Sequence, residues 1–420
     1  MKIRNVVLML MVSLLTIGSV FASNNAETSE KVKLVVLGYG DASTPDGKQF
    51  VINIENFIKA NPEIEIEWDM QYDELYHQKL QATLAGGEQL DVAFMWNGGS
   101  RHQPVLDAGE EIDQLQFVDP SNFHDGALAG GGKNGELFSI PNAKQAHTVM
   151  YSNDALLAEL GLTVATTYEE LLKQNEVAKA AGKIALAYPG ATSWCHNTFV
   201  YSVLVGRFGG AQHAKDLIAK KAKFTDAPTV KAFEFIKRMY DDGIVTENTL
   251  QADYGVSLAQ FNNGEALYMI DGGWRAAQVT LTNFTWNKFV AVPGEVAPGS
   301  GNGGYSAGYA IMKSATTEPA RKAAAVKLLQ YLTGEEASKV RALYSGQVPS
   351  FKVKGAIEYK QGTEPSAAYI SSLSSITDTV GDYIDGTTTA TFSDGVIELW
   401  LGTITPQELA EKTQKVYEEN

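Results

Sequence analysis

The chain has 420 residues, of which 44% are hydrophobic and 20% are charged, and these proportions are ordinary for a globular protein of one large or two smaller domains. Its formal net charge is −15. Nucleic acids and anionic lipids are bound through clustered Lys and Arg side chains, so this excess of acid excludes them as expected partners. It favours solubility and a neutral or cationic ligand.

The N-terminus has the pattern of an export signal. Lys2 and Arg4 precede an almost wholly apolar run over residues 6–17, and Ala22 provides a small residue at a cleavage point. The run is shorter than the about 20 residues that a membrane span requires, which argues against an anchor. We therefore expect residues 1–22 to be a cleaved signal peptide. Their removal makes the net charge −17, because they contain two bases and no acid.

Cys195 is the only cysteine of the chain. A lipid-anchored protein would need a cysteine at the cleavage point, and Cys195 lies far from it. We therefore expect a free periplasmic protein without a lipid anchor and without an internal disulfide. Cys195 itself is expected to be a small buried hydrophobic residue.

The first part of the mature chain alternates between strand and helix patterns. Buried or alternating strands are predicted at residues 32–37, 64–68 and 91–96, and amphipathic helices at residues 49–59 and 72–84. This order is typical of a parallel sheet with helices on both faces.

The rest of the chain continues the α/β pattern. Helices are predicted at residues 152–160, 167–181, 229–242, 318–333 and 406–419, another begins at residue 334, and a strand covers residues 266–270. Residues 292–304 stand apart, because they contain two prolines and five glycines without periodicity. They are predicted to form a crossing between domains or a lid.

One motif is typical of an enzyme. Residues 304–308 read Gly-Tyr-Ser-Ala-Gly, as in the nucleophile elbow of α/β-hydrolases. An elbow requires a helix after Ser306 and a histidine later in the chain, whereas a strand pattern follows and the last histidine is His213. We therefore expect no elbow. The glycine-rich run at residues 130–133 lacks the Ser or Thr of a phosphate loop, so we expect a turn there.

Metal-ligand patterns are also missing from the sequence. The six histidines never pair at ligand spacing and no calcium-loop pattern is present, so we expect no metal and no cofactor. A glycosidase stays open as an alternative, because its two carboxylates can occupy any positions and the chain has 49 acidic residues.

Seven segments, in order along nearly the whole mature chain, resemble the extracellular solute-binding proteins of ABC transporters, in the branch that includes maltose-binding proteins. They are residues 57–68, 79–96, 135–141, 150–161, 261–274, 323–349 and 405–417. The chain departs from the family pattern at Leu90, where proline is usual, and at residues 151–154, which read Tyr-Ser-Asn-Asp instead of Tyr-Asn-Lys-Asp.

This resemblance implies an α/β, two-lobed periplasmic-binding-protein fold of type II, with a mainly parallel sheet in each lobe and the ligand cleft at the hinge. The first lobe would comprise residues 23–145 and 300–343, and the second residues 146–299 and 344–420. Closure of such lobes around a ligand is a known switching motion.

Sugars present apolar C–H faces to aromatic rings and hydroxyls to polar side chains. Trp96 ends a predicted strand and Trp274 follows one, and ligands of α/β sheets bind beyond the carboxyl ends of strands. The resemblance also gives these two tryptophans a stacking role. Asn97, which directly follows Trp96, is expected to contact the ligand, and Arg275, which directly follows Trp274, either contacts the rim of the ligand or is solvated.

Further candidates follow from their places in the chain. Gln145 occupies the position of a family glutamate in the first crossing, with Lys144 and His147 beside it. The remaining candidates lie at strand ends, near crossings or in a loop of the second lobe: Tyr39, Asp41, Arg101, His102, Tyr188, Trp194 and Tyr305.

The resemblance implies a carbohydrate-binding component of an ABC importer, which hands its ligand to membrane permease subunits and is not an enzyme. We expect it to be a monomer. The alternatives are the same fold with a polyamine, a polyol phosphate or a metal as its solute, and an exported glycosidase.

Overall fold

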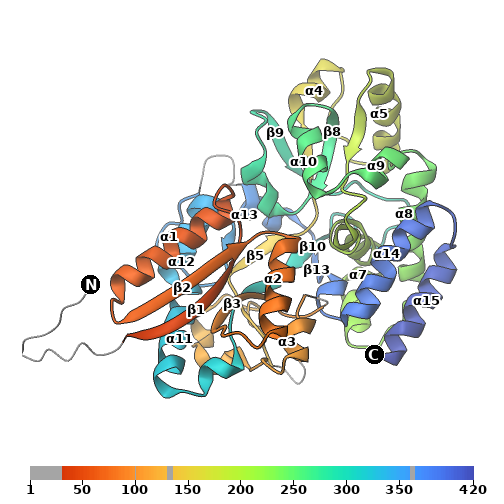
Figure 1. The fold of residues 1–420 in the computed structure, drawn as a ribbon. Helices are drawn as coiled ribbons and strands as arrows, with labels where there is room; N and C mark the ends of the chain where they lie inside the picture. Colours follow the sequence, from red (N-terminus) through yellow and green to blue (C-terminus); the bar gives the residue numbers. More distant parts are fainter. Residues whose placement is uncertain (1–30, 100, 130–135, 360–364) are drawn as a thin grey trace, which may run out of the picture. The chain divides into compact units, whose positions relative to one another are not determined.

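The computed structural model describes residues 31–99, 101–129, 136–359 and 365–420. The predicted signal peptide at residues 1–22 and the predicted turn at residues 130–133 lie outside the described residues. Three sheets and the helices around them confirm the α/β class (Figure 1).

The first five elements agree with the predicted order. They are β1 (Val32–Tyr39), α1 (Pro45–Ala60), β2 (Ile64–Gln71), α2 (Glu74–Ala85) and β3 (Val92–Trp96). Helix α1 begins four residues before the predicted start, because the Thr44 hydroxyl caps it by accepting a hydrogen bond from the amide of Gly47 and Pro45 occupies the first turn.

The first sheet has the strand order β2-β1-β3-β11-β4, where β11 is Ala307–Ile311 and β4 is Ile140–Pro141. β1 pairs with β2 and β3 in parallel, whereas β11 runs antiparallel to both of its neighbours. The prediction of a mainly parallel sheet therefore holds for its first three strands. β11 is antiparallel to β3 because it enters the sheet at the carboxyl end of that strand, where Ala307 pairs with Trp96.

A small second sheet joins connecting segments. Its order is β12-β5-β10-β13, with β5 at Ala143–Ala146, β10 at Gly301–Gly304, β12 at Val348–Pro349 and β13 at Ile376–Thr377. The end of the predicted crossing at residues 292–304 is strand β10, which pairs antiparallel with β5.

The third sheet has the order β7-β8-β6-β9, formed by Ile184–Ala187, Ala266–Asp271, Val149–Asn153 and Phe284–Asn287. Only the pair β7 and β8 is parallel among these strands, so the prediction of a mainly parallel sheet is wrong here. The helix predicted from residue 152 begins later, as α4 (Asp154–Glu159). Ser152 and Asn153 pair in the strand instead, and the Asn153 side chain caps α4.

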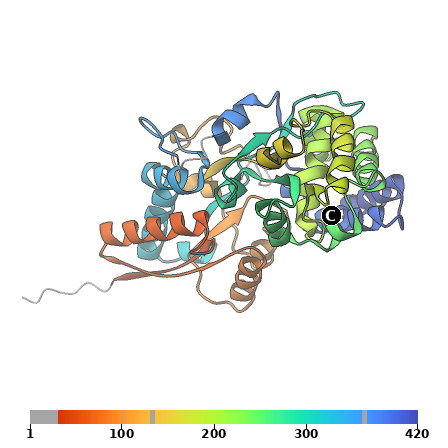
Figure 2. The ribbon, with the colours of Figure 1, turned by 90° about the horizontal axis from the view of Figure 1, so that it is seen from above.

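Helices such as α5, α10 and α11 pack against the sheets, whereas α8 packs against α7, α14 and α15 (Figures 1 and 2). The α-helices are α3 (Gln103–Asp107), α5 (Tyr168–Ala180), α6 (Ser193–Cys195), α7 (Ser202–Ile218), α8 (Ala227–Asp241), α9 (Glu247–Gln251), α10 (Tyr254–Asn262), α11 (Pro319–Leu332), α12 (Glu335–Ser345), α13 (Pro365–Ser372), α14 (Gly386–Trp400) and α15 (Pro406–Glu419). Short 3₁₀ segments include η5 (Gly273–Gln278) and η7 (Val380–Asp382), and η4 (His196–Tyr201) is a π-helix.

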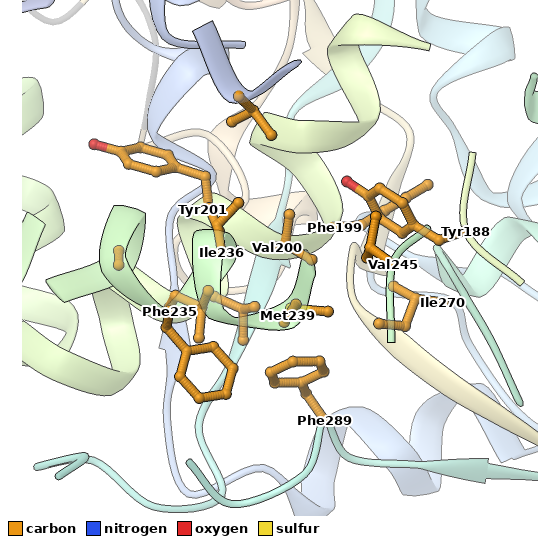
Figure 3. Packing of buried hydrophobic residues seen from close by; sticks show 14 of the residues in the cluster. Tyr188, Phe199, Val200, Tyr201, Phe235, Ile236, Met239, Val245, Ile270 and Phe289 are labelled. Atoms are coloured by element: carbon orange, nitrogen blue, oxygen red, sulfur yellow. The ribbon is translucent and has the colours of Figure 1, made fainter. Parts of the chain in front are cut away.

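The buried hydrophobic residues form separate cores. One core joins β1, α1, β11 and α11, and another joins the third sheet to α5, α7, α8, α14 and α15. Figure 3 shows Tyr188, Phe199 and Ile270 within the second core. Cys195 is buried there as a free cysteine, as predicted.

Helix α5 offers a small and well-defined test of local stability. The Thr167 hydroxyl accepts from the amide of Glu170, and the Glu170 carboxylate accepts from the amide of Thr167 in return. Thr167→Ala is expected to lower the free energy of unfolding by about 1 kcal/mol, because the capping acceptor is lost. Urea denaturation measures this change, and an unchanged midpoint would contradict the role of the cap.

Candidate ligand-binding site

A cavity of about 810 Å³, including its part open to solvent, lies among the three sheets. Its wall combines seven aromatic side chains with polar and titratable ones. The lining residues are Tyr39, Asp46, Gln49, Tyr72, Phe94, Trp96, Arg101, Asn142, Gln145, His147, Trp194, Thr198, Tyr254, Trp274, Ser306, Ala307, Gln347 and Asp382.

Trp274 is held firmly at this cavity. It follows β8 at the start of η5, and its indole N–H donates to the Tyr254 hydroxyl over 2.6 Å. A Cβ at Gly272 would lie 2.2 Å from the Trp274 ring, so a larger residue there would displace the ring from this position. The ring of His147 meets Trp274 edge to face at 5.5 Å. The orientation of the indole is therefore fixed before any ligand arrives.

Trp96 ends β3, and its ring belongs to an aromatic cluster. It contacts Tyr39 and Phe94 edge to face, at centroid distances of 5.3 and 5.1 Å. Tyr39 ends the neighbouring strand β1, so both rings come from the carboxyl ends of parallel strands. Both side chains line the cavity, where the argument from strand ends expects them.

Six of the ten predicted binding residues meet at this cavity, together with the neighbouring candidate His147. The six are Tyr39, Trp96, Arg101, Gln145, Trp194 and Trp274. Residues 53–362, well over half of the chain, match the family described as bacterial extracellular solute-binding protein. The chain belongs to this family.

Individual relatives agree with this membership. The solute-binding protein is 27% identical to the multiple sugar-binding protein of Streptococcus mutans serotype c over 317 residues, which cover 73% of this chain and 72% of that protein. A solved chitin oligosaccharide binding protein is 22% identical with a TM-score of 0.80, covering 93% of this chain and 99% of the other. A structure from work on xylan utilization by Caldanaerobius polysaccharolyticus is 21% identical with the same TM-score, covering 92% and 100%. These structures confirm the predicted fold.

Four of the predicted residues of the solute-binding protein do not line the cavity. Asn97 is buried, where its side-chain oxygen accepts from the amide of Ser139. Asp41 is exposed at the start of the α1 region and accepts from Ser43. Tyr305 lines a different pocket. Sequence position brings these residues near a strand end or crossing, but their side chains point elsewhere.

Arg275, the fourth of them, lies behind Trp274 and supports it. Its guanidinium donates to the Asp271 carboxylate over 2.8 Å, and both side chains are buried. It also lies 3.5 Å from the centre of the Tyr254 ring, and Tyr254 donates to the other carboxylate oxygen of Asp271. In this structure of the solute-binding protein, Arg275 therefore supports Tyr254 and Asp271 and does not line the cavity.

Three further candidates also do not line the cavity. His102 is buried against Phe138, with ring centroids 4.4 Å apart and planes nearly parallel. Tyr188 is a core residue whose hydroxyl lies 2.8 Å from His196 Nδ1. Lys144 faces the Tyr305 ring.

Two carboxyl groups that line the cavity were not predicted from the sequence. Asp46 lies in the first turn of α1 and accepts from the Gln347 side chain over 3.0 Å, and burial raises its pKa to about 6. Asp382 ends η7, and burial raises its pKa to about 7 although Arg101 opposes this. Neither follows a strand predicted from the sequence, so only the tertiary fold could have revealed them.

His147 and Ser306 lie side by side at the cavity. His147 Nε2 is 3.4 Å from the Ser306 hydroxyl, while its Nδ1 is 2.7 Å from the Thr379 hydroxyl and 3.8 Å from an Asp382 oxygen. Burial, with Arg101, lowers the pKa of His147 to about 4, so the ring is neutral near pH 7. The order of residues in the sequence did not indicate that His147 lies beside Ser306. Strand β11 directly follows Ser306, as predicted, so the strand–turn–helix geometry of a nucleophile elbow is not formed.

Nowhere in the described residues do three or more His, Cys, Asp or Glu side chains gather so that they could hold a metal ion. Within the same ranges of the chain, every helix falls short of the length and apolar character that crossing a bilayer requires.

Proposed function

We propose that this solute-binding protein captures a carbohydrate in the cavity and does not transform it chemically. This proposal rests on one observation: Trp96, Trp194 and Trp274 line one cavity together with hydrogen-bonding groups such as Gln145. Indole faces match the C–H faces of a pyranose, and polar side chains between them match its hydroxyls. The sugar-related descriptions of the relatives support the same ligand class.

The cavity would close between two lobes, for which we propose the ranges 23–145 with 300–343 and 146–299 with 344–420. The membership of the sheets supports this division, because the first sheet uses residues up to 141 and 307–311 and the third sheet uses residues 149–287. The small second sheet, which joins β5, β10, β12 and β13, is then the hinge.

In this function the protein acts outside the cytoplasmic membrane, after cleavage behind residue 22, as a periplasmic monomer. Lobe closure would create the surface that the permease subunits of an ABC importer recognise. Neither nucleic acid nor a cofactor takes part. The net charge of −17 for residues 23–420 agrees with a freely diffusing protein.

Thermal shift of purified residues 23–420 against mono- and oligosaccharides, polyols and polyamines tests the ligand class. A sugar that binds only the folded protein raises the melting temperature. Trp274→Ala is expected to weaken binding by about tenfold or more, because a fixed stacking ring is lost. Tyr344→Ala, which removes an exposed aromatic ring outside the cavity, serves as the matched control and should leave binding unchanged.

Product analysis of each binding sugar separates capture from catalysis. Recovery of intact sugar supports the transport function. Cleaved sugar that persists in Tyr344→Ala but is lost in Ser306→Ala would overturn it in favour of an enzyme at the His147 and Ser306 pair. A melting shift with polyamines or polyol phosphates alone would replace the carbohydrate by another solute.

A further inference from the structure

Arg101 has an unusual place in the cavity. It follows β3 in the loop before α3, and its guanidinium carbon lies 4.8 Å from the centre of the Trp96 ring and 4.9 Å from that of Trp194. The cation is thus in contact with two indoles that are 98 positions apart in the sequence. Contacts with aromatic rings leave the edge of a guanidinium, with its N–H donors, available for other groups.

This cation has no carboxylate partner within 4.0 Å among the described residues, although the chain is rich in acids. The other arginines near the site are engaged elsewhere. Arg275 is paired with Asp271, and Arg341 donates to the backbone oxygens of Asn142 and Leu332. Arg101 is therefore the cation that lines the cavity in the described part of the chain.

The carboxyl groups at the cavity are harder to ionise than exposed ones, so they oppose the charge of Arg101 less strongly near neutral pH. Burial raises the pKa of Asp382 to about 7 and that of Asp46 to about 6, and it also raises the pKa of Asp73. His77 and His147 are neutral, because burial lowers their pKa to about 3 and about 4. The excess of acid over the whole chain thus says little about the local charge of the cavity.

We propose that the ligand is an acidic sugar of the uronic acid type, whose carboxylate is bound by the guanidinium edge of Arg101. A guanidinium fork matches a carboxylate in two parallel hydrogen bonds, whereas a neutral hydroxyl uses only one of them. Trp274 would then receive the apolar face of the sugar. This inference rests on the proposed carbohydrate function and specifies its substrate class.

Isothermal titration with di- and trigalacturonate and with their methyl esters tests the proposal, because esterification removes the charge and keeps the sugar. The acid should bind at least about tenfold more tightly than the ester. Arg101→Gln should abolish that preference, so that acid and ester bind with similar affinities, since the charged fork is lost. Lys144→Gln, which removes a cation outside the cavity, should retain the preference.

The proposal also fixes the sign of a pH dependence. The ligand carboxylate stays ionised above about pH 5, because its pKa is near 3.5. Lowering the pH from 8 to 6 protonates Asp382 and part of Asp46 and so removes repulsion, and the affinity for galacturonate should rise by about fivefold. The methyl esters should show less of this rise.

The outcomes separate this inference from the function on which it rests. Tight binding of neutral hexose oligosaccharides or of glucosamine oligomers, with no gain from a carboxylate, would overturn the acidic-sugar proposal and leave carbohydrate capture standing. No binding of any charged or neutral sugar would overturn both. If Arg101→Gln does not fold, Arg101→Lys keeps the charge without the fork and should reduce the preference for the acid.

Discussion

Arg275→Gln is expected to lower the free energy of unfolding by about 3–5 kcal/mol, because it leaves the buried carboxylate of Asp271 without its counter-charge. Burial already raises the pKa of Asp271 in the presence of Arg275. Without the arginine, folding has to bury an uncompensated charge or bind a proton. The Tyr254 hydroxyl donates to this carboxylate and accepts from the Trp274 indole, so a change in Asp271 also weakens the hold on Trp274.

The chain contains a closely matched control for this change. Arg238 and Asp242 form an Arg–Asp pair with the same four-residue spacing, and Arg238 likewise lies over a tyrosine, Tyr168, but this pair is partly exposed. Arg238→Gln should therefore cost less than about 1 kcal/mol. Equal shifts of the urea midpoint in the two variants would contradict the importance of burial.

The pH dependence of Arg275→Gln has a definite sign. A carboxyl whose folded pKa lies above its unfolded value of about 3.9 binds a proton on folding, so its contribution to stability is lost as pH rises through the folded pKa. The deficit of Arg275→Gln relative to the wild type should therefore be smaller at pH 5 than at pH 8. Urea titrations at the two values measure it.

Gly308→Ala is expected to cost about 3 kcal/mol of stability or more. Gly308 lies in β11 opposite Pro141 of β4, and an added Cβ would stand 1.7 Å from the backbone oxygen of Ile140. Backbone cannot yield as a flexible side chain does, so the strands would have to separate. Because Ser306 and Ala307 lead into β11 and line the cavity, ligand affinity should fall as well.

Gly255→Ala is the control for this substitution. Gly255 lies in the first turn of α10, and a Cβ there meets only an oxygen of Asp253 at 3.5 Å. A helical Gly→Ala change without a clash should be neutral or slightly stabilising. A urea midpoint for Gly308→Ala as high as that of Gly255→Ala would show that β4 is not held against β11.

Most secondary structure was predictable because the apolar periodicity of each element is strong. Strand β8 is buried along its whole length, and helix ends carry explicit signals such as the cap at Thr167. The boundary at Ser152 failed because pairing with β9 outweighs local helical pattern. Mixed pairing in the sheets also escaped prediction, since strand direction depends on contacts between distant segments.

The candidate site residues at strand ends could be predicted from the sequence, whereas those that come from irregular segments could not. Trp96 and Trp274 were found from their places after strands, whereas Asp382 reaches the cavity from a short 3₁₀ segment without a sequence signal. The Gly-x-Ser-x-Gly match also has a structural explanation. Its second glycine, Gly308, is required by the close approach of β4 and not by a nucleophile.

The insertion of β11 between β3 and β4 has a consequence for how the molecule is made. Gln114 donates to and accepts from Ile311, 197 positions later, so the first sheet cannot be completed until three quarters of the chain exists. At about 5–20 residues per second, synthesis leaves the edge of β3 uncovered for roughly 10–40 s. Folding that depends on such distant pairing is slow. A nascent chain of this topology stays unfinished long enough to be threaded through a translocation channel before it becomes compact.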